Sequence, residues 1–357
     1  MRNSILISLL CFTLLCTGCT TESTSIENSL DSSINTITNN NENSATRDLF
    51  AMDTYMNLTA YGSNAEQAVD KAVSCINDLD KLLSTGLKTS EISQLNDSGN
   101  MILSSDASII LENSIKLYDN TNGAFNPLMY PIMEAWGFPT KEYKVPEEDE
   151  LNQLLTLTDM SNLKYKNSTG EVSFNLSGMK VDFGGIAKGY TSSKVRDCFI
   201  SSGVTSGIIS LGGNVQAIGK KPDGSMWRVG VQNPDSEGNI LGVLKIQDKA
   251  VITSGGYERY FEQDGKTYHH IIDPSTGMPA DSGLTSVTII SDNGTLADGL
   301  STALFVMGLE KASDYWRDHY EEFDAVFFTD DKKLYITEGI QENFSSDYTW
   351  NTIDKEY

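Results

Sequence analysis

The strongest constraint on the fold lies in the second half of the chain. Short strand-like runs follow one another there without an intervening helix. These runs cover residues 206–218, 226–232, 242–254, 268–273 and 284–291, and Gly, Asp, Asn or Pro separates each run from the next. Consecutive strands without crossover helices pair mostly antiparallel, whereas a parallel sheet requires βαβ alternation. The sequence therefore predicts an α+β fold with mostly antiparallel strands.

Helical periodicity flanks these runs on both sides. Before them, an amphipathic pattern runs from a capping box at Asn64 to about Ser84, a second pattern covers residues 106–119, and a third lies between Gly185 and Gly203. These patterns predict helices that flank the strands.

Two further helical patterns, at residues 297–307 and 309–319, precede two closing strands near 325–328 and 333–336. No linker or internal repeat divides the chain after residue 46. We therefore expect residues 47–357 to form one domain, whose two halves could appear as lobes.

The N-terminus reads MRNSILISLLCFTLLCTGC, which is a basic start followed by an apolar run that is short for a membrane span. This pattern predicts an export signal over residues 1–18. The small residues before Cys19 resemble a bacterial lipobox, in which the cysteine is acylated. We expect an extracytoplasmic protein, lipid-anchored through Cys19 to the bacterial cell membrane. An ordinary cleaved signal with a chance cysteine is the alternative.

Residues 19–46 are nearly all Ser, Thr, Asn, Asp and Glu, so they cannot bury enough apolar surface to fold and are expected to form a flexible tether. Beyond the N-terminal segment only Cys75 and Cys198 remain, which we expect to be buried thiols rather than a disulfide or a metal site. The formal net charge of −23 argues against a nucleic-acid partner. A phosphorylated small molecule would need a local metal ion or a helix N-terminus.

Three segments carry candidate chemistry. In VDFGGIAKGY, adjacent glycines at Gly184 and Gly185 join a strand end to a helix start, and Lys188 offers a positive charge to an anion. A tight turn with a solvated lysine would explain the same pattern without a function.

In ADGLSTALFVMG, Asp298 and Thr302 are one helical turn apart, so their oxygens face the same side and could share a hard cation such as Mg²⁺. The alternative is that both oxygens satisfy nearby backbone groups.

In HHIIDPSTG, His270 is a candidate general base next to a rigid turn formed by Asp273, Pro274 and Gly277. His269 and His319 are expected to be ordinary surface residues. The glycine pairs of ISLGGN and TSGGYERYF predict strand bends or places where a planar ring lies against bare backbone.

The order of these segments resembles one known family. The series MDTYM, GAFNP, WGF, VDFGGIAKGY, ISLGGN, WRVGVQNP, TSGGYERYF, HHIIDPSTG and ADGLSTALFVMG is closely similar to that of the ApbE family, the FAD:protein FMN transferases. The resemblance spans nearly the whole predicted domain. It implies a reaction in which FAD is cleaved at its pyrophosphate, FMN is esterified to a Thr or Ser hydroxyl of a target protein, and AMP is released.

The resemblance also implies roles for individual residues. Mg²⁺ is expected on Asp298, Thr302 and the backbone carbonyl of Gly185, and His270 is expected to be the base. The residues expected to line the FAD site are Met52, Ala124, Phe125, Asn126, Asp182, Lys188, Ile271 and Ile272, with Trp136 as an aromatic neighbour. The chain departs from the family at Asp53, where Gly is common, and at Asn126, where Asp is frequent.

Two other functions fit the same segments: a Mg²⁺-dependent FAD pyrophosphatase that yields FMN and AMP, and a non-catalytic flavin-binding lipoprotein. The presence of a base next to a metal site argues against a mere binder. The acceptor protein is expected to be exported and to belong to an electron-transfer chain, although no residue identifies it.

Overall fold

The computed structural model describes residues 43–236 and 238–356. The predicted signal at 1–18, most of the predicted tether and the lipidation site Cys19 lie outside the described residues. Within the described residues, every helix is too short or too polar to traverse a lipid bilayer.

A nine-stranded sheet forms the centre of the described chain, in the order β1-β2-β6-β7-β10-β13-β14-β15-β17. All neighbouring strands pair antiparallel except β15 and β17, as predicted from the missing crossover helices. The strands are β1 Ser44–Ala51, β2 Thr54–Tyr61, β6 Ser206–Leu211, β7 Asn214–Ile218, β10 Ala250–Gly255, β13 Leu284–Ser291, β14 Asp324–Thr329, β15 Leu334–Thr337 and β17 Trp350–Ile353.

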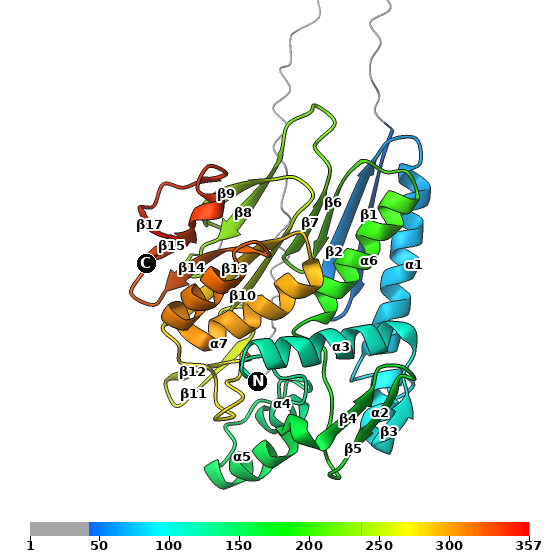
Figure 1. The fold of residues 1–357 in the computed structure, drawn as a ribbon, viewed down its shortest axis with the longest axis vertical. Helices are drawn as coiled ribbons and strands as arrows, with labels where there is room; N and C mark the ends of the chain where they lie inside the picture. The colour runs from blue at the N-terminus through cyan, green and yellow to red at the C-terminus, as the bar shows by residue number, and fades with distance from the viewer. Residues whose placement is uncertain (1–42, 237, 357) are drawn as a thin grey trace, which may run out of the picture. The chain divides into compact units, whose positions relative to one another are not determined.

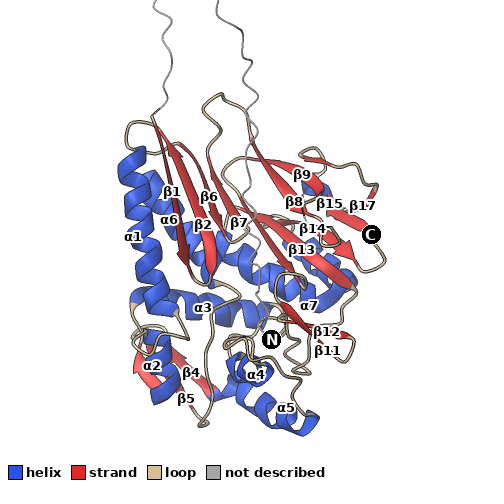
Figure 2. Cartoon of the chain, turned by 180° about the vertical axis from the view of Figure 1, so that it is seen from behind, coloured by secondary structure: helices blue, strands red, loops and turns tan. Residues whose placement is uncertain are grey.

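Three helices, α1 (Ala65–Leu83), α6 (Ala187–Ser201) and α7 (Gly294–His319), cover one face of this sheet, and Figure 2 shows the strands in front of α6 and α7. Helix α1 buries one stripe of apolar side chains at helical spacing, including Val69, Ile76 and Leu83, as its sequence predicts. In α7 the helical dihedral angles break at Gly308, whose φ is 77°. The two helices predicted there are therefore joined end to end across a kink.

The capping box predicted at Asn64 is wrong. The Asn64 side chain makes no cap hydrogen bond, and its amide instead donates to the carbonyl of Ser202 at 2.8 Å. The long-range contact ties the start of α1 to the end of α6, and a local pattern cannot reveal such a partner.

A second, smaller sheet covers the other face of the large sheet. It consists of β8 (Trp227–Gln232), β9 (Ile240–Ile246) and β16 (Phe344–Ser345) in the order β16-β9-β8. Trp227 and Leu244 of the small sheet share one core with Val251 and Ile290 of the large sheet. Because side chains alternate along a strand, the neighbouring Ile252 and Ile289 point to the helical face.

The chain between α1 and α6 forms a separate part, which Figure 1 shows next to the large sheet, with its helix α3 on the side toward the sheet. Its elements are α2 Glu91–Ser98, β3 Asn100–Ile102, α3 Ser105–Asn120, α4 Tyr130–Trp136, α5 Glu148–Leu155, the 3₁₀ turns η1 Thr156–Thr158 and η2 Met160–Asn162, β4 Leu163–Lys166 and β5 Glu171–Phe174. The remaining elements are the hairpin of β11 Tyr260–Gln263 and β12 Lys266–His269, and η3 Glu338–Ile340. Of this separate part, periodicity predicted only α3, since the other helices span two turns or fewer.

Two further expectations need correction. Strand β1 begins at Ser44 and buries Ala45, so the last residues of the predicted tether 19–46 belong to the sheet. Cys75 on α1 and Cys198 on α6 are free and half-buried rather than fully buried. Burial, and then the adjacent Cys198, raises the pKa of the Cys75 thiol to about 12.

Candidate functional site

A pocket of about 1330 Å³ is lined by both parts of the fold. Twelve predicted site residues line it: Met52, Ala124, Phe125, Asn126, Asp182, Gly185, Lys188, His270, Ile271, Ile272, Asp298 and Thr302. They come from the β1–β2 turn, the loop after α3, the start of α6, the turn after β12 and the first half of α7. The pocket thus brings together segments that are far apart in the sequence.

Trp136, which was expected next to the flavin, does not line this pocket. It is fully buried, packs against Tyr268 and Phe261, and its indole N–H donates to the carbonyl of Gly277 at 2.8 Å. Phe138, two residues later, lines the pocket instead. Trp136 therefore supports the DPSTG turn from behind and makes no contact with the cavity.

The DPSTG turn itself is rigid, as the sequence predicts. Asp273 accepts hydrogen bonds from the backbone and hydroxyl of Ser275 at 2.8 and 2.7 Å, and its carbonyl accepts from Gly277 at 2.8 Å. Gly277 has a φ of 71°, which favours glycine. This turn fixes the chain directly after the histidine pair.

Asp298 is buried at the inner end of the pocket, with both carboxylate oxygens oriented by the protein. Gly189 donates its backbone N–H to Oδ2 at 2.7 Å, and the Asn214 side chain donates to Oδ1 at 3.0 Å. A Cβ on Gly189 would lie 2.2 Å from the carbonyl of Gly294, so helices α6 and α7 approach this closely only with glycine there. This contact accounts for the glycine of AKGY.

Thr302 lies one turn along α7 from Asp298, and its hydroxyl is 3.3 Å from that of Ser254 on β10. The neighbouring Gly185 is close enough that an added Cβ would lie 3.7 Å from the Thr302 hydroxyl oxygen. Asp298 and Thr302 thus lie on one side of α7, as their spacing predicted, and Gly185, which the family resemblance adds to them, lies next to Thr302.

This set of donors fits Mg²⁺. Within residues 43–236 and 238–356, no three His, Cys, Asp or Glu side chains are grouped to hold a metal ion. Among the three predicted ligands only Asp298 carries a carboxylate, and Thr302 and Gly185 would add neutral oxygens. Mg²⁺ is typically held by one or two carboxylates, with waters and substrate phosphates completing its octahedron.

His270 faces the pocket with one ring nitrogen already committed. Its Nδ1 lies 3.1 Å from the carbonyl oxygen of Arg259, and because a carbonyl only accepts, Nδ1 carries the hydrogen and Nε2 is left as the basic nitrogen. The ring also packs edge-on against Phe138. Burial, followed by the positive charge of Arg259, lowers the pKa of His270 to about 3, so the imidazole is neutral in the free protein and is a weaker base than an ordinary histidine.

The other two histidines differ from each other. His269 was expected on the surface, but it is half-buried, its Nε2 lies 3.2 Å from the carbonyl of Ala280, and burial lowers its pKa. It packs edge-on against Phe305 of α7. His319 pairs with Glu322 near the end of α7, and it is a surface residue as expected.

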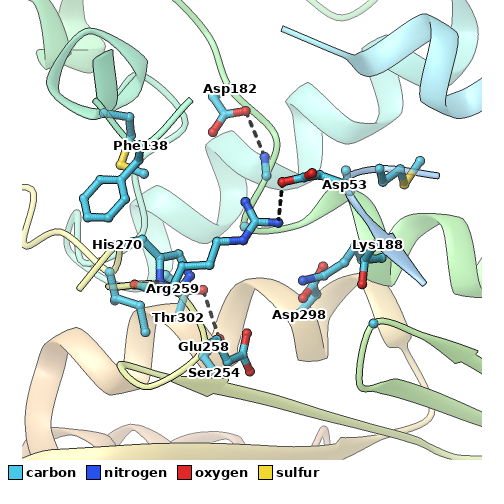
Figure 3. A pocket seen from close by; sticks show the side chains of 18 of the residues that line it. Asp53, Phe138, Asp182, Lys188, Ser254, Glu258, Arg259, His270, Asp298 and Thr302 are labelled. Carbon is cyan, nitrogen blue, oxygen red and sulfur yellow. Dashed lines mark hydrogen bonds and ion pairs between the residues drawn. The ribbon is translucent and has the colours of Figure 1, made fainter. Parts of the chain in front are cut away.

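Further charged residues line the pocket, among them Asp53, which the sequence marked only as a departure from the family, and Glu258 and Arg259, which it did not single out (Figure 3). Burial raises the pKa of the Glu258 carboxyl, and the positive charge of Lys188 offsets part of this rise. Glu258 and Arg259 belong to TSGGYERYF, a segment named above for its glycine pair. The strand pattern, however, gave no reason to select these two side chains.

Asp182 and Asn126 line the pocket on the side of the separate part. Burial raises the pKa of Asp182, and the backbone N–H of Gly184 donates to its carboxylate at 3.1 Å. The Asn126 side chain donates to the carbonyl of Thr158 at 2.9 Å and accepts from the backbone of Leu128 at 2.9 Å. Asparagine at this position therefore holds the loop together without adding a negative charge to the pocket.

Comparison with known proteins places this arrangement in a family. Residues 52–327 match the ApbE family. The chain is 33% identical over 290 residues to the FAD:protein FMN transferase of Treponema pallidum, covering 76% of this chain and 80% of that protein. It is 36% identical over 235 residues to that of Klebsiella pneumoniae, covering 65% of this chain and 72% of that protein.

Solved structures agree with this comparison. The ApbE protein of Thermotoga maritima is 28% identical and superposes with a TM-score of 0.79, covering 84% of this chain and 99% of that one. The flavin transferase ApbE of Vibrio cholerae is 26% identical with a TM-score of 0.76, covering 85% of this chain and 99% of that one. The match to the family extends over most of the chain and includes the pocket residues from Met52 to Thr302, and the chain therefore belongs to the ApbE family.

Proposed function

We propose that the protein transfers FMN from FAD to a Ser or Thr hydroxyl of an exported acceptor protein and releases AMP. The observation that carries this proposal is that one pocket holds His270, whose Nδ1 is bonded to a carbonyl so that Nε2 is the basic nitrogen, together with the oxygens of Asp298 and Thr302, which suit a hard cation. The relatives in the family bear the name FAD:protein FMN transferase.

The residues have distinct tasks in this reaction. The acceptor hydroxyl attacks the phosphorus on the FMN side of the pyrophosphate, a new P–O bond forms, and the bridging P–O bond breaks so that AMP leaves with the bridging oxygen. His270 takes the hydroxyl proton on Nε2, while its Nδ1–H stays bonded to the carbonyl of Arg259. The imidazole is neutral before the reaction, so the lone pair of Nε2 is available for this proton.

Asp298, Thr302 and the carbonyl of Gly185 would hold Mg²⁺, which neutralises charge on the pyrophosphate when it is bound. Asn214 and Gly189 keep the Asp298 carboxylate in one orientation through their hydrogen bonds. The chain's own contribution is thus to hold these oxygens still. Lys188 adds a positive charge to the same space.

The rest of the pocket suits the non-reacting parts of FAD. Phe125, Ile271 and Ile272 are buried apolar residues that line it, and Met52 and Ala124 extend this apolar surface. Asp182 offers a carboxylate to a ring or ribose donor. The cavity exceeds the few hundred to about 1000 Å³ of ordinary small-molecule sites, which leaves space for a dinucleotide.

We also propose that the protein acts outside the cytoplasm, anchored by lipid on Cys19, on exported subunits of an electron-transfer chain. This proposal rests on the sequence of residues 1–46 alone.

The deciding experiment incubates the full chain with FAD, Mg²⁺ and an acceptor domain that offers a Thr in an exposed loop, and then records intact masses. Addition of one FMN to the acceptor, lost with His270→Gln, is the expected result. FMN and AMP without a modified acceptor would replace the transferase with a pyrophosphatase. Intact FAD under all conditions would leave only a flavin-binding protein.

A further inference from the structure

Arg259 is the strongest unassigned feature of the pocket. Its guanidinium lies within the cavity, and Figure 3 shows it and the ammonium of Lys188 directed into the same open space. Its ion-pair partner is Asp53, with Nη2 and Oδ2 3.3 Å apart. Asp53 is also reached by Lys141, at 3.5 Å. One carboxylate thus pairs with two cations at the opening of the pocket and leaves a net positive charge there.

The Asp53–Arg259 ion pair is expected to contribute little free energy, because both side chains are partly exposed to solvent. Both side chains are about half exposed, at 50% and 52%, and ion pairs of this kind contribute only about 0 to 1 kcal/mol. The contact is also made through a single nitrogen–oxygen pair rather than a bidentate one. A ligand with more negative charge could therefore displace Asp53 at little cost.

Asp53 occupies a backbone position that tolerates an aspartate but does not require one. It and Met52 form the β1–β2 turn with φ values of 57° and 49°, in the left-handed region where glycine is least strained. Since neither the turn nor the core needs an aspartate here, the carboxylate has a role only through what it contacts. Those contacts are the two cations of the pocket rim.

We propose that Arg259 is a binding residue for the pyrophosphate of FAD, and that Asp53 occupies its guanidinium until the dinucleotide arrives. This inference rests on the proposed function and assigns a phosphate contact within it. The planar guanidinium can donate two parallel hydrogen bonds to phosphate oxygens, a geometry that the carboxylate contact in the free protein does not use. Arg259 and Lys188 would then contact the pyrophosphate from the two sides of the open space.

The same residue links phosphate binding to the base. The backbone carbonyl of Arg259 accepts hydrogen bonds from the backbone N–H and Nδ1 of His270, at 3.0 and 3.1 Å. A phosphate on the guanidinium would also offset the positive charge that opposes protonation of the imidazole. Binding of the substrate would therefore make His270 a stronger base where the acceptor hydroxyl arrives.

The test is a double-mutant cycle on binding. The full-length protein, Asp53→Asn, Arg259→Gln and the double variant are titrated with FAD and with riboflavin in the presence of EDTA, with flavin fluorescence as the readout. Asparagine tolerates the left-handed turn, so Asp53→Asn changes the charge and preserves the backbone. Lys144→Gln and Asp97→Asn serve as matched charge controls, since neither residue lines the pocket.

We expect Arg259→Gln to weaken FAD binding by about 10- to 100-fold, as for a charge-assisted phosphate contact, and to leave riboflavin binding within about twofold. Asp53→Asn should tighten FAD binding by about two- to fivefold, and this gain should disappear in the Arg259→Gln background. The control substitutions should leave both affinities within about twofold.

Equal loss of FAD and riboflavin binding in Arg259→Gln would overturn the proposal, because it would indicate a structural role. An Asp53→Asn gain that persists without Arg259 would also overturn it. Failure of the proposed function is distinguishable: the unmodified protein would then bind no FAD, or would bind it without any transfer of FMN.

Discussion

The two ends of the pocket are built in opposite ways. At the inner end, on α7, Asp298 is buried and each of its carboxylate oxygens accepts a hydrogen bond of 3.0 Å or less from the protein. At the rim, Asp53 and Arg259 are half exposed and share one contact of 3.3 Å. The inner end is held in a single arrangement, whereas the rim can exchange partners.

This difference suggests that the inner end and the rim contribute to different steps, namely catalysis and substrate binding. Groups that must meet developing charge benefit from being oriented before the substrate binds, because no reorganisation is then needed during the reaction. Groups that admit a large charged substrate must release their existing contacts first. Substitutions at the inner end should therefore reduce turnover, and substitutions at the rim should change affinity.

The largest effect is expected for Asp298→Asn. Loss of the only carboxylate of the predicted Mg²⁺ site should reduce FMN transfer by at least about a thousandfold, while FAD binding in EDTA stays within a few-fold. The measurement is transfer rate by intact mass together with a fluorescence titration. Asp292→Asn, an exposed carboxylate just before α7, is the control. Comparable loss of FAD binding would contradict the separation of turnover from affinity.

His270→Gln should have the next largest effect. Removal of a general base reduces the rate by about 10² to 10³, with FAD affinity little changed. Single-turnover transfer rates would measure it, with the surface residue His319→Gln as the control. A rate within threefold of the unmodified protein would exclude His270 as the base.

Asn214→Ala tests the inner end more finely. Asn214 is not a predicted ligand, but its side chain donates a hydrogen bond to Asp298. Loss of a group that orients a metal ligand should reduce the activity or the apparent Mg²⁺ affinity by about 10- to 100-fold. A Mg²⁺ titration of the transfer rate measures this, and Asn113→Ala on the exposed side of α3 is the control. An unchanged Mg²⁺ midpoint, with unchanged activity, would show that Gly189 alone orients Asp298.

The pH dependence tests the environment of the base. The pKa of His270 is lowered to about 3 in the free protein, and the neutral imidazole is the active form, so kcat/KM should show no fall due to His270 between pH 8 and 5. A histidine with an ordinary pKa near 6.5 would lose about 30-fold by pH 5. Rates over this range, normalised to folded protein by circular dichroism, decide between these outcomes. A midpoint near 6.5 in kcat/KM would contradict the structure's electrostatics.

Trp136→Phe should have the smallest effect on activity, below about threefold, because the indole faces away from the pocket. It removes the hydrogen bond to the carbonyl of Gly277, which should reduce the free energy of unfolding by about 1 to 3 kcal/mol. Urea denaturation and FAD titration measure the two effects, with Trp350→Phe as the control for loss of an indole. A large loss of FAD affinity at unchanged stability would instead support the prediction that Trp136 contacts the flavin.

Much of this site could be predicted from the sequence, because its features depend on neighbours within one turn. The four-residue spacing places Asp298 and Thr302 on one side of α7, and the DPSTG segment forms its turn through contacts within five residues. The absence of crossover helices predicted antiparallel pairing in the large sheet. The similarity of the ordered motifs then indicated the family.

Tertiary structure decided the features that depend on distant partners. Asn214 meets Asp298 across 84 residues, the indole of Trp136 reaches Gly277 across 141, and Arg259 pairs with Asp53 from a distant segment of the chain. Local periodicity states which side chains share a face, but not which distant group that face meets. For this reason the sequence alone determined the strand pairing and predicted a base and cation ligands, whereas packing determined the tautomer of His270, the orientation of the Asp298 carboxylate and the charge pair at the rim.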